Sequence, residues 1–238
     1  MEPTSTDLFQ AMDDTWSAAE YRDLPPFVLR HSAGGGQRVN AATLLGEFEP
    51  YDITAAEKVM VAQKNTPLFR LSRADSRLDR VLMERGYKLV DPTVIFLAKI
   101  TDLEIVEPAP LAAISCRSPL ALMEEIWKQG GISNGRVRVM HQTKDPKSYV
   151  LARHADQPAG CAFIACAENI AMLHALEIAP GKRKLGCAQS ILHHCAIWAR
   201  DHGAQYLSAL TTRENTPAQK LFSGFGMQIA EEYHYRKK

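Results

Sequence analysis

The chain is 238 residues long, with 46% hydrophobic and 23% charged residues, a composition typical of a folded globular protein rather than a disordered one. Its 28 lysines and arginines nearly balance its 27 aspartates and glutamates, and a net charge of +1 argues against general electrostatic binding to nucleic acid or to an anionic membrane. No apolar run approaches the ~20 residues that cross a bilayer, and the first ten residues are acidic and polar, unlike a secretory signal. We therefore expect a cytoplasmic protein of one large or two small domains.

The cysteines indicate reduced thiols rather than disulfides or zinc ligands. They number five and include no C-x-x-C pair. His193, His194 and Cys195 are adjacent, but neighbouring positions on a helix point about 100° apart and do not converge on one ion. We therefore expect no metal site. The cysteines are Cys116, Cys161, Cys166, Cys187 and Cys195.

The first hundred residues predict alternating strands and helices. A helix is expected over residues 52–63, because Thr54 and Glu57 have the spacing of a capping box. Asp75 is expected to cap a second helix that ends at Gly86. Strands are predicted over residues 27–30, 39–45, 68–71 and 87–100, the last interrupted at Asp91–Pro92.

The second part follows a proline-bearing linker at residues 106–110. An amphipathic helix is predicted over residues 119–128, before a glycine-rich break at 130–135 that leads into residues 137–141. Strands are predicted over residues 147–154, 160–166, 170–178 and 205–210, and helices over residues 185–199 and from Asn215 onward.

The most informative stretch runs from Met172 to Ala188. An apolar strand ends at a proline–glycine turn, passes three cations and reaches small residues at the start of an amphipathic helix. The N-terminus of a helix offers unpaired N–H groups and a favourable dipole to a phosphate. A glycine at position 186 would let the backbone approach such a ligand closely. The alternative is an ordinary solvated basic turn.

This stretch resembles the acetyl-CoA loop of the GCN5-related N-acetyltransferases, whose pattern is Arg/Gln-x-x-Gly-x-Gly/Ala, here Arg183-Lys-Leu-Gly186-Cys-Ala188. A second block, from Asn215 to Met227, resembles the Asn-x-x-Ala-x-x-Leu-Tyr-x-x-x-Gly-Phe segment of the same family. The resemblance implies an α/β (α+β) fold with a mixed, mostly antiparallel twisted sheet flanked by helices. It is clear from residue 103 onward and faint before residue 100.

The resemblance also implies where acetyl-CoA binds. The pyrophosphate would meet the backbone of Arg183, Lys184, Leu185, Gly186, Cys187 and Ala188. Backbone N–H groups from Leu176 to Ile178 would hold the pantetheine arm and polarise the thioester carbonyl, an interaction typically worth ~3 kcal/mol. Asn215 and Phe222 would lie beside the coenzyme, although Asn215 could equally serve as a helix cap.

Acyl transfer to an amine also needs a base, because a free amine has a pKa near 10. Glu177 and His174 lie on the central strand and are the candidates. Strand alternation places them on opposite or offset faces, so only one is expected to face the reacting centre. Glu177 is the first choice, since His174 could be a buried, satisfied imidazole, and water could relay the proton.

One position departs from the family. Phe222 stands where the family has a tyrosine that protonates the leaving thiolate, and phenylalanine cannot donate a proton. A coenzyme A thiolate is a fairly good leaving group, so water or another group could suffice. Tyr233 and Tyr235 on the last strand are possible substitutes, or simply core residues.

The two ends of the chain also resemble each other. Placing Gly86 on Gly226, an offset of 140 residues, aligns Asp75 with Asn215 and superimposes a strand, a helix and a second strand. Any two β-α-β segments could align this well. The interpretation that we favour is a tandem chain, with a degenerate, smaller acetyltransferase-like half at 1–100 and the acetyltransferase domain at 101–238. Only one coenzyme site is expected.

Residues 34–36, three consecutive glycines, do not continue as a nucleotide P-loop, because no Gly-Lys-Ser/Thr follows and no helix is expected there. A hairpin with left-handed residues is the simpler interpretation. Arg38 and Asn40 after it could face the acceptor cleft.

Taken together, the sequence predicts a metal-free, acetyl-CoA-dependent N-acetyltransferase, a monomer or homodimer, acting on a small-molecule or peptide amine. A non-catalytic acyl-CoA-binding or regulatory module is the alternative, because of Phe222. A structural repeat without ligand is a third interpretation, which Gly186 and the basic loop disfavour.

Overall fold

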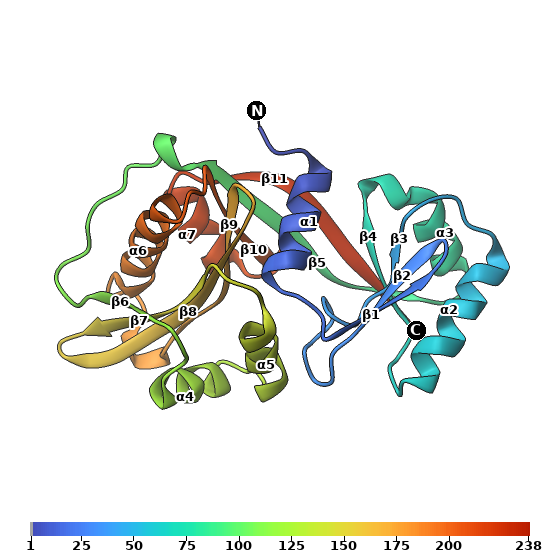
Figure 1. The fold of residues 1–238 in the computed structure, drawn as a ribbon, viewed down its shortest axis with the longest axis horizontal. Helices are drawn as coiled ribbons and strands as arrows, with labels where there is room; N and C mark the ends of the chain where they lie inside the picture. Colours follow the sequence, from blue (N-terminus) through green and yellow to red (C-terminus); the bar gives the residue numbers. More distant parts are fainter. Residues whose placement is uncertain (1) are drawn as a thin grey trace.

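The computed structural model describes residues 2–238, which form two sheets with seven α-helices around them (Figure 1). The helices are α1 (Ser5–Thr15), α2 (Pro50–Ala62), α3 (Ser76–Glu84), α4 (Ala121–Gln129), α5 (Asn134–Gln142), α6 (Cys187–Asp201) and α7 (Thr216–Gly224). The strands are β1 (Glu20–Leu24), β2 (Phe27–His31), β3 (Thr43–Leu44), β4 (Leu68–Ser72), β5 (Lys88–Lys99), β6 (Ala113–Cys116), β7 (Lys147–His154), β8 (Gln157–Ala167), β9 (Ile170–Ile178), β10 (Tyr206–Thr212) and β11 (Gln228–Lys237). Within residues 2–238, no helix has the length and apolar character needed to cross a membrane.

The large sheet has eight strands in the order β4-β11-β5-β10-β9-β8-β7-β6, and every neighbouring pair is antiparallel except β9 and β10. Its two faces bury alternate residues, as a pleated strand requires. On β9, Ala171 and Leu173 pack with α6 and α7, whereas Ile170 and Met172 pack with α1. Helices α4 and α5 cover the same face as α1, over β7 and β8. The predicted mixed, mostly antiparallel sheet flanked by helices is confirmed.

Strands from the two ends of the chain alternate in this sheet. Strand β5 lies between β10 and β11, and β11 lies between β5 and β4. The offset that places Gly86 on Gly226 also relates the strand pairings: Ser72–Tyr233 corresponds to Thr212–Thr93. Both glycines end their helices with positive φ, 82° and 95°. The β4-α3-β5 and β10-α7-β11 units are therefore paired about a pseudo-twofold axis.

Several predicted elements differ from the structure. Only Thr43–Leu44 of the strand expected over residues 39–45 is extended, because the Asn40 side chain folds the preceding residues into a turn by bonding to Ser32 and Gly36. Helix α2 begins at Pro50 rather than at residue 52, since proline fits the first helical position and the Asp52 carboxylate accepts the Glu49 N–H. Thr54 is therefore not a cap.

The predicted interruption at Asp91–Pro92 is accommodated within β5, which runs without a break. Thr93 pairs with Tyr233 and Val90 pairs with Tyr235, so Asp91 and Pro92 together oppose one residue of β11. This bulge places Asp91 at a φ of 46° and leaves the proline without a required ladder bond.

Helix α1 and strands β1 and β6 have no counterpart among the predicted elements. In Figure 1, α1 crosses the middle of the molecule, and its buried residues Leu8, Ala11 and Met12 pack on the large sheet. Thr4 and Asp7 form a capping box at its start. The N-terminal helix thereby covers the same sheet face as the site described below.

Candidate functional site

The site begins where two parallel strands separate. β9 and β10 pair from Ile170–Tyr206 to Leu173–Ala209, and no pairing continues beyond that point. The remainder of β9, from His174 to Ile178, diverges from the end of β10. The gap between them gives a ligand access to the backbone of the central strand.

A β-bulge lies at this point of separation. Cys161 pairs with Glu177 and Phe163 with His174, so Ala175 and Leu176 together oppose a single residue of β8. Ala175 has a φ of 51°, and its carbonyl accepts the Trp127 Nε1–H at 2.8 Å. A bulge leaves one backbone N–H out of the ladder, free to face the gap.

The bulge also changes which way the two candidate bases face. Cys161 and Phe163 are two residues apart on β8 and lie on one face, so their partners Glu177 and His174 also share a face. The prediction that these two residues lie on opposite faces is therefore wrong, because the extra residue resets the alternation.

The backbone around the start of α6 is rich in unpaired donors. In residues 2–238, the N–H groups of residues 184–189 donate to no protein acceptor. Gly186 is the N-cap with a φ of 80°, a conformation that favours glycine, and the position of a Cβ there would be open. Such a run of amides at a helix N-terminus suits an anionic pyrophosphate. The loop residues therefore fit a coenzyme A diphosphate.

The cationic side chains of the loop behave differently from one another. Arg183 turns back toward β9, where its Nη2 lies 3.2 Å from Glu177 Oε1 and its Nε donates to the Ile178 carbonyl. Lys184 has a φ of 63° and, like Lys182, makes no ion pair among the described residues. The backbone amides and the two lysine side chains, rather than Arg183, are thus the donors left free.

The remaining predicted loop residues divide by burial. Leu185 is exposed, Cys187 is buried against the sheet, and Ala188 is half-buried on the first turn of α6. Leu176 and Ile178 pack their side chains at the edge of the α6 core. Their backbone, rather than their side chains, is therefore the part that faces the gap.

Glu177 sits at the mouth of the gap with 19% of its side chain exposed. A Cβ built on Gly130, the residue after α4, would lie 2.5 Å from the Glu177 Cδ. The glycine therefore leaves the space that the carboxylate occupies. Gly130 and Arg183 together fix the direction of the Glu177 side chain.

His174 is buried and has a partner at each ring nitrogen. Thr15 Oγ1 donates to the Ala11 carbonyl, so it accepts from His174 Nε2, 2.9 Å away. The Nδ1 lone pair then accepts from Arg38 Nη1 at 3.1 Å. Burial and then Arg38 and Arg136 hold the pKa of His174 well below its usual range. The imidazole is neutral, and both of its ring nitrogens are already hydrogen-bonded.

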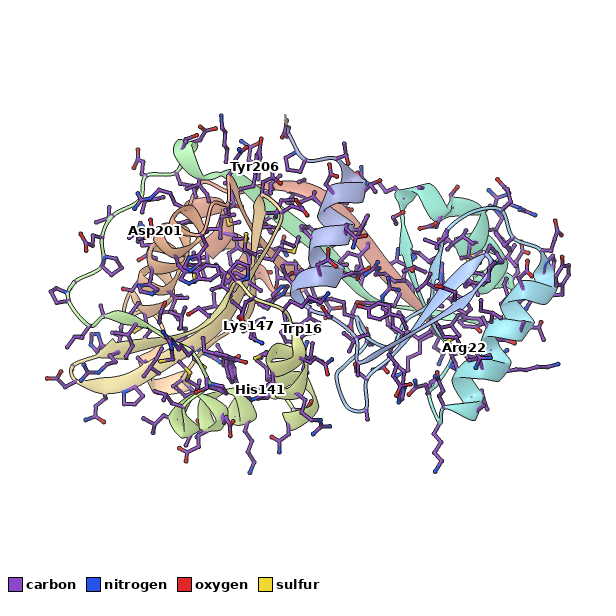
Figure 2. The ribbon with its side chains drawn as sticks, in the orientation of Figure 1. Trp16, Arg22, His141, Lys147, Asp201 and Tyr206 are labelled. Atoms are coloured by element: carbon purple, nitrogen blue, oxygen red, sulfur yellow. The ribbon has the colours of Figure 1, made fainter. Side chains whose placement is uncertain are left out.

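Trp16 completes the surroundings of this histidine. Its ring lies 5.1 Å from the His174 ring and 6.1 Å from Phe163, and the Arg38 guanidinium lies 5.5 Å from its centroid. Figure 2 shows Trp16 near the middle of the molecule, just after α1. The sequence reasoning missed Trp16 and Thr15 because it did not predict α1.

The predicted coenzyme contacts in the second motif differ in exposure. Asn215 caps α7 by accepting the Ala218 N–H, as the cap interpretation predicted. Phe222 is only 3% exposed, with its ring 5.5 Å from that of Phe96 in the core. Tyr233 and Tyr235 are buried and pack edge to face at 5.5 Å. Burial and then Tyr233 raise the pKa of Tyr235 well above its usual value, so its phenol is neutral.

Beside the gap lies a cavity of about 530 Å³, which we call the arginine cavity. Its wall contains residues 36–38, Asp91 and Thr93, the α4–α5 connection with Arg136, residues 210–212 of β10, Asn215, and Tyr233 and Tyr235. Of the two candidates after the glycine turn, Arg38 faces the cavity. Asn40 instead holds the turn together.

Sequence reasoning did not single out Arg136 or Gln37. The turn at residues 34–36 packs so closely on α5 that a Cβ on Gly135 would lie 2.2 Å from the Gly34 carbonyl carbon. Ser133 caps α5 and donates its hydroxyl to the Gly34 carbonyl. These contacts bring Arg136 beside Arg38. The expected glycine-rich break before residue 137 was the available signal.

The cysteines and paired histidines form no metal centre in the part of the chain that the structure describes, where no group of three His, Cys, Asp or Glu residues could hold an ion. His193 accepts the Val106 N–H, whereas His194 bonds to Ser115. All five cysteines are free.

Part of the sequence is similar to a known protein family. Residues 119–227 match the model of the Acetyltransferase (GNAT) family. The chain has a GNAT acetyltransferase fold. No curated protein matches the sequence.

GNAT structures similar to the whole chain share little sequence with it. A GCN5-related N-acetyltransferase from Kribbella flavida has a TM-score of 0.75 at 14% identity, covering 100% of this chain and 96% of the other. A putative GNAT acetyltransferase from Novosphingobium aromaticivorans has a TM-score of 0.59 at 12% identity, covering 97% and 95%. One from Sphaerobacter thermophilus has a TM-score of 0.63 at 12% identity, covering 83% and 72%. The GNAT likeness therefore includes the N-terminal portion.

Proposed function

We propose that the chain transfers an acetyl group from acetyl-CoA to the primary amine of a small molecule or peptide, by direct attack in a ternary complex. The observation that carries this proposal is the run of unpaired N–H groups at residues 184–189, directly after a bulged strand that separates from its neighbour. A diphosphate at the helix N-terminus would place the pantetheine arm along the gap. The GNAT family match supports the same assignment.

The chain would supply three functions to the reaction. Backbone N–H groups between Leu176 and Ile178 would donate to the thioester oxygen as the amine nitrogen attacks the carbonyl carbon. Glu177 would accept the proton that the amine loses, directly or through water. The C–S bond then breaks, a water or the phenol of Tyr235 returns a proton to the thiolate, and the proton held by Glu177 passes through water to restore that donor.

His174 would not act as the base. Its Nδ1 lone pair is engaged by Arg38, and its Nε2 hydrogen by Thr15. We propose instead that it positions the Arg38 guanidinium at the cavity wall. Glu177, in contrast, has one ion-pair partner, Arg183, and its carboxylate could still accept a proton.

The binding step can be tested with two matched glycines at the ends of α6. Gly186 and Gly203 have φ values of 80° and 83°, and both have open space at the Cβ position. Gly186→Glu should weaken coenzyme A binding by at least ~100-fold, because a carboxylate would occupy the anion site. Gly203→Glu has the same backbone strain and should bind normally. Equal affinities by calorimetry would refute the assignment.

The catalytic step needs a separate test. Glu177→Gln should lower kcat by about 100-fold while the affinity for coenzyme A stays the same. The readout is release of the coenzyme thiol with a panel of amines. An unchanged kcat would remove Glu177 from the mechanism.

A non-catalytic acyl-CoA-binding module is the second candidate, favoured by the burial of Phe222 at the position of the family tyrosine. Coenzyme binding without turnover on any amine of the panel would support it.

We also propose the division into an N-terminal, degenerate GNAT-like half at 1–100 and an acetyltransferase domain at 101–238. The matching strand registers of the two β-α-β units support this division.

A further inference from the structure

The arginine cavity contains two guanidinium groups and no acid paired with either. Among residues 2–238, neither Arg38 nor Arg136 makes an ion pair, and the single protein hydrogen bond of Arg38 is to the neutral His174. Both Nε atoms are buried without an acceptor. Both side chains are half-buried, and a partly desolvated cation without a counter-charge becomes more favourable when an anion reaches it.

The two arginines are held close together before any ligand arrives. The contact between Gly34 and Gly135 fixes the glycine turn on α5, so Arg38 and Arg136 project from two anchored segments. Burial and then the Arg38 charge lower the pKa of Arg136, as expected for neighbouring like charges. Arg38 is additionally fixed by His174 and the face of Trp16. The pair is therefore preorganised.

The other residues that line the cavity do not neutralise the positive charge of the two arginines. Asp91 is the one carboxylate among the lining residues that the structure describes, and it is exposed and forms no ion pair with either arginine. Gln37 Oε1 is buried without a donor. The site thus offers cationic forks for an anion and one acceptor for an N–H or O–H group.

We propose that the acceptor is a primary amine that carries an anionic group, which Arg38 and Arg136 bind together. This inference rests on the proposed acetyl transfer and specifies its substrate class. A planar guanidinium matches a carboxylate or a phosphate through paired hydrogen bonds, whereas a neutral amine would leave both arginines unpaired. α-Amino acids and amino-alkyl phosphates share this chemistry.

Matched substrates test the proposal. Each pair differs only in the anion: glycine and methylamine, phenylalanine and phenethylamine, phosphoethanolamine and ethanolamine. The anionic member of at least one pair should have a kcat/KM at least ~100-fold above its neutral partner, because a site built for a polar group rejects the analogue that lacks it. The pair that shows the preference distinguishes carboxylate from phosphate.

Variants connect the preference to the arginines. Arg136→Gln should reduce the ratio at least tenfold, mainly through KM, since one of the two forks is removed. Arg200→Gln is the matched control, because Arg200 lies on α6, pairs with Asp201 and is exposed. It should leave the ratio unchanged. A preference that survives Arg136→Gln overturns the role of this pair.

A second measurement does not depend on turnover. With saturating coenzyme A, calorimetry with the N-acetyl derivatives of the same compounds should detect binding of the anionic products only, and Arg136→Gln should abolish it. Equal binding or equal turnover of neutral and anionic members overturns the inference while acetyl transfer stands. Failure to bind coenzyme A would instead overturn the proposed function.

Discussion

The two β-α-β units that pair at the centre of the sheet share a local backbone geometry but differ in the ion pairs and helix caps around it. In each unit, the first strand lies parallel to a neighbour: Phe69 bridges to Ala42, and the corresponding Ala209 pairs with Leu173. A cavity lies at the end of each of these strands. The N-terminal cavity, of about 590 Å³, includes Ser72, which corresponds to Thr212 in the arginine cavity.

The charges in the two cavities are balanced differently. In the N-terminal cavity, Asp13 lies 2.6 Å from both Arg30 and Arg70. In the arginine cavity, neither Arg38 nor Arg136 makes an ion pair with any residue from 2 to 238. The first pair of arginines therefore shares a carboxylate within the chain, and the second is left for a ligand.

The helices that precede the two units show the same contrast. Helix α2 begins with Pro50, which has no N–H, and the Asp52 carboxylate already accepts the Glu49 N–H. Helix α6 begins after Gly186 with no side-chain cap. A helix N-terminus occupied by its own carboxylate has little to offer a phosphate. This difference explains why only one coenzyme site is expected.

The largest predicted effect tests the N-terminal cavity, in which Asp13 pairs with both arginines. Asp13→Asn should lower the free energy of unfolding by about 3–5 kcal/mol, because it leaves Arg30 and Arg70 buried without a counter-charge. Asp14→Asn on the same helix is the control, since the Asp14 carboxylate accepts only from the exposed Gln10 side chain among the described residues and should change stability by less than ~0.5 kcal/mol. Urea unfolding provides both values, and equal losses would contradict the assignment.

The same carboxylate predicts a pH dependence. Burial alone would raise the pKa of Asp13, but Arg70 and Arg30 together bring it below its usual value. A carboxylate with a lowered folded pKa stabilises the protein above its unfolded pKa of about 3.9, and that stabilisation is lost as the pH falls through the folded value. The difference in the free energy of unfolding between the wild type and Asp13→Asn should therefore begin to shrink below pH ~4 and disappear only below the lowered folded pKa. A constant difference would oppose this explanation.

A smaller effect is expected at the open gap. Gly130→Ala would place a methyl group on the Glu177 side chain and should lower kcat about tenfold by moving the carboxylate. Gly181→Ala meets no atom within 4 Å and should leave kcat unchanged. Steady-state rates with one good amine measure both, and equal rates would show that the position of Glu177 does not matter.

The smallest predicted change in stability distinguishes an arginine without an ion pair from the arginines that pair with Asp13. Arg136→Met should leave the free energy of unfolding within ~1 kcal/mol of the wild type or raise it, because no ion pair is lost and a desolvated charge is removed. Thermal and urea unfolding measure the difference. A loss comparable to that of Asp13→Asn would mean that the two cavities do not differ in charge balance.

The hydrophobic pattern was sufficient for most of the second part of the fold. Strands β7 and β9 and helix α6 lie where their apolar residues predicted them, because each buries a regular face. Helix α1 was predictable in principle, because Leu8, Ala11, Met12 and Thr15 have helical spacing and follow a Thr4–Asp7 capping box, but this short segment was interpreted only as unlike a secretory signal. Its position depends on the sheet face that it covers.

The candidate site was predictable where it depends on local sequence. Gly186 follows from the motif around it, and its φ of 80° agrees with that choice. The bulge at Ala175 was not predictable, since no glycine or proline marks it. Arg136 meets Arg38 only because Gly34 touches Gly135, a contact between segments about a hundred residues apart.

The interleaving of β4, β11, β5 and β10 has a consequence for synthesis. Until β11 leaves the ribosome, β4 and β5 lack the strand that joins them, and both present unpaired edges. Early native pairing of β4 and β5 therefore awaits a segment translated more than a hundred residues after β5, which lengthens the interval in which these edges can mispair. Loss of residues from this strand would remove the pairing of β4 with the large sheet, while β5 would stay paired with β10.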